Sequence, residues 1–156
     1  MIIQINQFYN KRNPMERVIL TTPAVEISEI NQDIIDFYCD LKDTFNEHLE
    51  EASGLASNQI WTTVKYPPPA MFVFKTGFDG QYVIALNPKI KGTGKKIKKY
   101  EGCLSLRDRK PVIKKRDKNV TISYMDIDGD HFVEKYTLDV ARTIFHEYDH
   151  LLGKVI

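Results

Sequence analysis

The sequence predicts an α+β fold, in which mainly antiparallel sheets pack around a C-terminal helix and one long helix lies near the N-terminus. Two segments carry apolar residues at steps of three and four, the spacing that forms the buried face of a helix. Between them, short apolar or alternating runs are separated by turn sequences, as in β-hairpins. The 156 residues suit one domain, residues 1–156, because a single core at this length buries about two-thirds of the chain's surface.

The long N-terminal helix is expected over residues 31–52. Asn31 or Ser28 can cap its start, and Ser53–Gly54 can end it. Cys39 lies inside this segment and is interpreted as a small core residue. The apolar stripe of the helix consists of Ile34, Tyr38, Leu41, Phe45 and Leu49.

Two hairpins are expected in the middle of the chain. Apolar strands at 71–74 and 82–86 flank a Gly-containing turn. Alternating strands at 120–125 and 131–137 flank a second turn that contains Asp128–Gly129. These strands supply the antiparallel part of the predicted fold.

The last helix, expected over residues 138–152, carries two histidines one turn apart. His146 and His150 stand at i and i+4 on one helix face, where both imidazoles can bind one metal ion. Glu147 lies beside them and can exchange a proton with water at that ion, which completes an H-E-x-x-H pattern. The alternative is a charged, solvated helix face. Apolar neighbours favour the metal site, because they indicate a buried helix: Ile144, Phe145, Leu151 and Leu152.

A third metal ligand is expected upstream, because no His, Cys, Asp or Glu follows His150. That order differs from metallopeptidases whose third ligand follows H-E-x-x-H. Cys103 would complete a Cys-His-His site, although an inert buried thiol fits the spacing equally well. The other candidates are several carboxylates together with Cys39, His48 and His131.

Composition excludes several other classes of protein. Lys plus Arg is 22 and Asp plus Glu is 21, so the formal net charge of +1 argues against coating nucleic acid through bulk charge. Two cysteines exclude a disulfide framework. No apolar run approaches the roughly 18 residues of a membrane span, and the N-terminus lacks the features of a signal peptide. We therefore expect a cytoplasmic protein without membrane association; an organelle or a phage-infected host cytoplasm also fits.

Three segments together resemble the signature motifs of peptide deformylases. They are Gly54-Leu55-Ala56-Ser57-Asn58-Gln59, Glu101-Gly102-Cys103-Leu104-Ser105 and His146-Glu147-Tyr148-Asp149-His150, in that order. The resemblance covers nearly the whole chain and is closest to short members without a C-terminal extension. It implies a hydrolase of protein biosynthesis that removes the formyl group from formyl-methionyl peptides and releases formate.

The resemblance also implies a role for each motif residue. The metal would be held by Cys103, His146 and His150, with Fe²⁺ as the native ion and Zn²⁺ or Ni²⁺ able to use the same ligands. Glu147 would act as general base, and the Gln59 amide and Leu104 N–H would stabilise the oxyanion. The nascent N-formylated polypeptide would lie as an added strand that contacts Gly54, Leu55 and Gly102.

Some positions depart from the family pattern. Ala52 and Ser57 replace a glycine and an alanine of the first motif, and Arg107 stands where a proline is usual. Arg142 stands one turn before His146, where family members often carry an apolar residue that faces the side-chain pocket. These departures bear on substrate preference more than on the chemistry.

Two alternative functions fit parts of the sequence. One is another metal-dependent peptidase or amidase. The other is a nucleic-acid or ribosome-binding module that uses the basic stretch from Lys89 to Lys99, although a solvated basic loop explains that stretch as well. Weak ribosome contact through the same lysines is compatible with the deformylase interpretation, as is a monomeric state.

Overall fold

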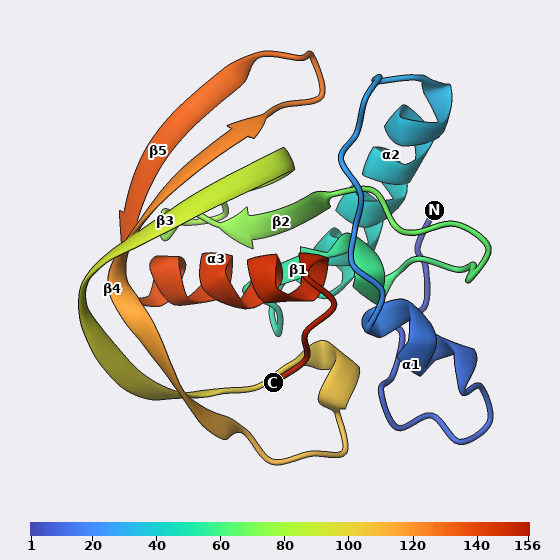
Figure 1. Cartoon of the computed structure of the whole chain (residues 1–156), viewed down its shortest axis with the longest axis horizontal. Coiled ribbons are helices and arrows are strands. Elements are labelled where there is room, and N and C mark those ends of the chain that lie inside the picture. Colours follow the sequence, from blue (N-terminus) through green and yellow to red (C-terminus); the bar gives the residue numbers. More distant parts are fainter.

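The computed structural model describes residues 1–156, in which one five-stranded antiparallel sheet curves around a helix (Figure 1). The strands are β1 (Gly54–Ala56), β2 (Met71–Lys75), β3 (Tyr82–Glu101), β4 (Val112–Met125) and β5 (His131–Thr137). They neighbour one another in the sheet in the same order as in the chain. The α+β class is therefore confirmed, with one continuous sheet where several were expected.

The helices are α1 (Met15–Leu20), α2 (Gln32–Glu47) and α3 (Leu138–Leu151), with short 3-10 helices η1 (Ser57–Gln59) and η2 (Leu104–Leu106). None of the helices combines the length and apolarity that crossing a bilayer requires.

Alternation along β2 gives the sheet two apolar faces. Met71 and Val73 belong to an 11-residue cluster that includes Leu41 of α2. Phe72 and Phe74 point the other way, into a 10-residue cluster that includes Ile144 of α3. The strand, which is buried from Met71 to Phe74, therefore separates α2 from α3.

The long helix expected over residues 31–52 is shorter in the structure, and another helix precedes it. A six-residue α1 comes first, and α2 has 16 residues. Asn31 caps α2 as expected, because its side chain accepts a hydrogen bond from the Ile34 N–H at 3.1 Å. The helix ends at Glu47, and residues 48–51 continue as turns. Glu47, Glu50 and Glu51 accumulate at this end, where the helix dipole disfavours negative charge.

Both predicted hairpins are confirmed, but β3 and β4 extend far beyond them. The lysine stretch expected to form a loop is the second half of β3, where for example Lys98 pairs with Lys115 of β4. The lysine run shows no strand pattern in the sequence. It forms a strand because its backbone hydrogen-bonds to β4. Register shifts near Lys89 and Lys96 accompany the bend of this ribbon around α3 (Figure 1). The bend brings the end of β3 back to α3.

α3 ends where the sequence predicted. Gly153 has a φ of +77° and follows the last turn, and its N–H donates to the His150 carbonyl. A Cβ at this position would lie 2.5 Å from the Thr21 carbonyl oxygen. The conformation and the space both require glycine.

Candidate metal centre

Cys103, His146 and His150 form the only group of three metal-ligating side chains in the structure. Their ligand atoms lie within 4.8 Å of one another, and Cys103 Sγ is 3.4 Å from His150 Nε2. Cys103 lies between β3 and η2, whereas both histidines come from α3. The predicted pair on α3 is therefore joined by a thiol from 43 positions upstream of His146.

The other predicted candidates for the third ligand lie elsewhere. Cys39 is exposed, so its assignment to the core was wrong. It stands two residues from Leu41 and six from Phe45, which places it away from the apolar stripe of α2. His131 is exposed at the tip of the second hairpin, and His48 bonds to Glu51 at the end of α2.

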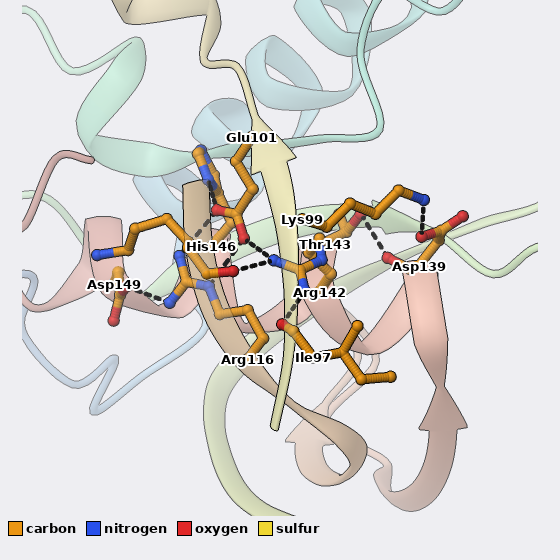
Figure 2. Close-up of polar contacts among 10 residues, drawn as sticks. Ile97, Lys99, Glu101, Arg116, Asp139, Arg142, Thr143, His146 and Asp149 are labelled. Carbon is orange, nitrogen blue, oxygen red and sulfur yellow. Dashed lines mark hydrogen bonds and ion pairs between the residues drawn. The ribbon is translucent and has the colours of Figure 1, made fainter. Parts of the chain in front are cut away.

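Glu101 orients one of the two histidines. Its Oε1 lies 3.0 Å from His146 Nδ1, so the other ring nitrogen, Nε2, is the one that remains for a ligand. Arg116 binds Glu101 through two bonds of 2.9 Å, and Arg142 adds a third at 2.7 Å (Figure 2). Burial raises the pKa of Glu101, but hydrogen bonds with His146 and Arg116 lower it more, so the net shift is downward. Glu101 is thus a fixed carboxylate behind His146.

Asp149 pairs with a basic residue and is not part of the metal-ligating group. Arg116 donates to its Oδ2 at 2.6 Å, which links β4 to α3 beside the cluster (Figure 2). The sequence did not single out Arg116, because it lies in a run of charged residues, Lys114-Lys115-Arg116-Asp117-Lys118. Its distinguishing property is burial, with 9% of its surface exposed.

The two histidines differ in their titration. Burial lowers the pKa of His146, but hydrogen bonds with Cys103 and Glu101 raise it more strongly, to about 10. Burial and the positive charges of His146 and Arg116 lower the pKa of His150 well below its ordinary value. His150 is therefore a neutral imidazole, the form that binds a metal ion.

Glu147 lies buried against β1. Only 4% of its surface is exposed, and its Oε2 has no hydrogen-bond partner in the protein. Burial raises the pKa of Glu147 to about 7, with opposing contributions from the charges of His146 and Glu101. Gly54 makes this placement possible, because a Cβ there would lie 2.8 Å from Glu147 Cγ. The glycine therefore accommodates a side chain of the site, a requirement that the sequence did not reveal.

Gln59 is held with its amide nitrogen toward the cluster. The Ala56 N–H donates to Gln59 Oε1 at 2.9 Å, which leaves Nε2 to approach Ser105 Oγ at 3.2 Å and Cys103 Sγ at 3.7 Å. Ser105 was not predicted as a partner. Leu104 begins η2, so its backbone N–H has no acceptor inside that helix.

One cavity of about 610 Å³ opens on this cluster. Gly54 and Gly102, two of the three residues predicted to contact the peptide, line it. Leu55 does not: its side chain is fully buried in the α2-side cluster. The predicted catalytic and metal-ligating residues that line the cavity are Gln59, Cys103, Leu104, His146 and Glu147, while His150 lies behind them.

The donor set fits a divalent transition metal ion. One thiol and two imidazoles converge, and both histidines present Nε2 to the cluster. Such sulfur and nitrogen donors suit Fe²⁺, Zn²⁺ and Ni²⁺. Three protein ligands would also leave a coordination position open on a bound ion, as in catalytic sites.

A family model described as polypeptide deformylase matches residues 7–156. The chain belongs to this family. Peptide deformylases are metallo-hydrolases that remove the N-formyl group from nascent peptides, and the resemblance seen in the three motifs is therefore confirmed. This membership supports the enzyme over the alternative of a binding module.

Curated deformylases from bacteria cover most of the chain. The peptide deformylase of Pseudothermotoga lettingae is 31% identical over 137 residues, which are 86% of this chain and 73% of that protein. Peptide deformylase 1 of Clostridium perfringens is 33% identical over 136 residues, which are 86% of each chain.

Solved deformylase structures share the fold. The crystal structure from Thermotoga maritima aligns with a TM-score of 0.79 and 23% identity, and covers 98% of this chain and 93% of that one. A Met-Ala-Ser-bound structure from Acinetobacter baumannii aligns with a TM-score of 0.78 and 20% identity, over 98% and 96% of the two chains.

Proposed function

We propose that this deformylase holds one divalent ion through Cys103, His146 and His150, with Fe²⁺ as the native ion. The single observation that carries the proposal is the convergence of these donors with Glu147 at the cavity. When bound, such an ion supplies Lewis-acid activation of water and of a carbonyl oxygen. Zn²⁺ or Ni²⁺ can use the same ligands.

Glu147 is proposed as the group that moves the proton. It accepts a proton from the attacking water as the new C–O bond forms at the formyl carbon, then donates it to the amine as the C–N bond breaks and formate leaves. A pKa of about 7 suits both steps near neutral pH. Its buried, unpartnered oxygen supports this role, because such an atom is costly unless a ligand uses it.

Gln59 and Leu104 are proposed to stabilise the negative charge on the formyl oxygen. Gln59 presents its Nε2 because Ala56 holds the amide oxygen, and the Leu104 N–H is free of helical bonding. Both groups are set by the backbone, so little reorganisation is needed during the reaction.

The peptide is proposed to pair with β1. β1 is an edge strand whose only neighbour in the sheet is β2, so its second edge is available for an added strand. Gly54 lies at the cavity end of that edge, and Leu55 would contribute through its backbone because its side chain is buried. Gly102 also lines the cavity, and a Cβ there would meet open space.

The cellular setting follows from this activity. We propose one catalytic domain over residues 1–156, acting as a monomer in the cytoplasm on nascent N-formylated polypeptides. Lys91 and Lys98 are exposed on β3, which supports weak ribosome contact through that strand.

The test is formate release from formyl-Met-Ala-Ser by protein purified anaerobically with Fe²⁺, alongside metal analysis. Glu147→Ala is expected to retain the metal and to lose about 10²- to 10⁴-fold in kcat. Glu47→Ala, an exposed change on α2, serves as the matched control and should keep full activity. Internal cleavage of unblocked peptides without formate release would instead indicate a different metallo-peptidase.

A further inference from the structure

We propose that the cavity beside the metal centre accepts a first side chain that ends in a neutral hydrogen-bond acceptor, such as methionine sulfoxide or glutamine, as readily as methionine. This inference rests on the proposed function and specifies the class of formylated peptide that the same site takes.

The first side chain enters the part of the cavity that adjoins the cluster. It branches from the carbon bonded to the formamide nitrogen, so it cannot lie far from the reacting carbon. The adjacent walls come from two elements that run past each other. One wall is the face of α3 that carries the residues three, four and seven positions before His146. The other wall is the end of β3. Besides His146, the cavity-lining residues of these walls are Lys99, Tyr100, Glu101, Asp139, Arg142 and Thr143.

These walls contain no aliphatic side chain, and Tyr100 alternates with Lys99 and Glu101 along β3 and is 67% exposed. Arg142 occupies their middle and is 9% exposed, with its guanidinium held along the wall by Glu101 and two backbone carbonyls (Figure 2). Those carbonyls belong to Ile97 at 2.6 Å and Lys114 at 3.0 Å. A purely apolar side chain therefore gains little here, because it would displace water from polar groups without pairing them.

The far end of this region offers a hydrogen-bond donor. Lys99 Nζ binds Asp139 Oδ1 at 2.6 Å, and the two residues come from β3 and α3 (Figure 2). Asp139 lies seven residues before His146, or about 10 Å along the helix, and the flexible stem of Lys99 lets its ammonium meet a substrate side chain that extends part of this way. An ammonium has three protons, and Asp139 uses one of them. The remaining donors suit an acceptor on the substrate.

Charge favours a neutral acceptor over an ionised one. A carboxylate would approach Asp139 and Glu101, whereas an ammonium would approach Lys99 and Arg142. Lys99, Asp139 and Arg142 also line a second cavity of about 230 Å³, so they form the partition between the two spaces. The partition is polar on both sides.

The first test compares kcat/KM for formyl-Met-Ala-Ser with kcat/KM for the same peptide carrying methionine sulfoxide or glutamine first. We expect the three values to agree within about threefold, because the site can pair the added oxygen. A preference of about 30-fold or more for methionine, as an apolar pocket would give, overturns the proposal. Absence of formate from every peptide would overturn the proposed function itself, which is a distinguishable result.

The second test uses a matched pair of substitutions on β3. Lys99→Met removes the donor in the cavity, whereas Lys96→Met removes a lysine that also binds an aspartate, Asp117, at 2.8 Å but does not line the catalytic cavity. Both lysines are more than half exposed, so neither change should unfold the protein. We expect the methionine-to-sulfoxide ratio of kcat/KM to rise about tenfold in the Lys99 variant only. Equal ratios in both variants overturn the role of Lys99.

Discussion

The two faces of the sheet bury helices of similar length with different chemistry. α2 packs into a cluster of 11 buried apolar residues. α3 packs into a cluster of 10, but it also buries Arg142, Glu147 and His150. Burying apolar surface stabilises the fold, whereas burying charges costs free energy that pairing only partly offsets. The α2 face therefore serves stability, and the α3 face combines stability with the chemical site.

Glu101 connects the charged groups of the α3 face. It lies at the end of β3 and binds Arg116 of β4, with Arg142 and His146 of α3. One carboxylate thus joins three elements and also orients His146, a proposed metal ligand. A change in this network should alter both folding and metal binding, while a change on the α2 face should alter folding alone.

The largest effect on stability is expected from Arg116→Met. The substitution leaves Glu101 and Asp149 without their shared cation and should lower the free energy of unfolding by about 3–5 kcal/mol. Urea denaturation measures this value. Arg107→Met, which removes an exposed pair with Glu51, is the control and should cost less than about 1 kcal/mol. Similar small values for both variants would contradict the role given to the network.

Leu41→Ala tests the α2 face. Leu41 is fully buried, so the lost burial and the cavity should lower the free energy of unfolding by about 2–5 kcal/mol. Metal affinity and kcat of the folded fraction should stay unchanged, as measured by chelator competition and formate release. A loss of metal affinity in this variant would show that the two faces are not separate.

Glu101→Gln tests the link between the network and the metal. Loss of the carboxylate behind His146 Nδ1 should weaken metal binding about 10- to 100-fold, because the ring loses its orienting partner. Competition with a chelator for Zn²⁺ measures the affinity. Glu51→Gln, at an exposed carboxylate that lines the same cavity, should leave it unchanged. Equal metal affinities for the two variants would contradict the role of Glu101 in orienting His146.

The smallest effect is expected from Asn31→Ala. The variant loses the side-chain cap of α2, which should lower the free energy of unfolding by about 1 kcal/mol. Thermal or urea unfolding detects this change, and formate release should be unaffected. A drop in activity would mean that α2 contributes to the site more than its packing indicates.

The predicted elements were most accurate where the sequence carries a local period. The stripe that includes Leu41 and Phe45 located α2, and alternation at residues 120–125 located the second hairpin. Prediction failed where pairing with a distant segment decides the structure. Lys98 and its neighbours have no strand pattern of their own, yet they form a strand by pairing with β4.

The sequence by itself determined the α+β class, the histidine pair of α3 and the family, because periodicity and motif spacing are local properties. Tertiary structure alone brings the thiol of Cys103, which the motifs had named, to the histidines and explains why Gly54 is a glycine. It also decided that Arg142 binds Glu101 along the cavity wall. These facts depend on contacts between residues far apart in the chain, and such contacts form only when the chain is folded.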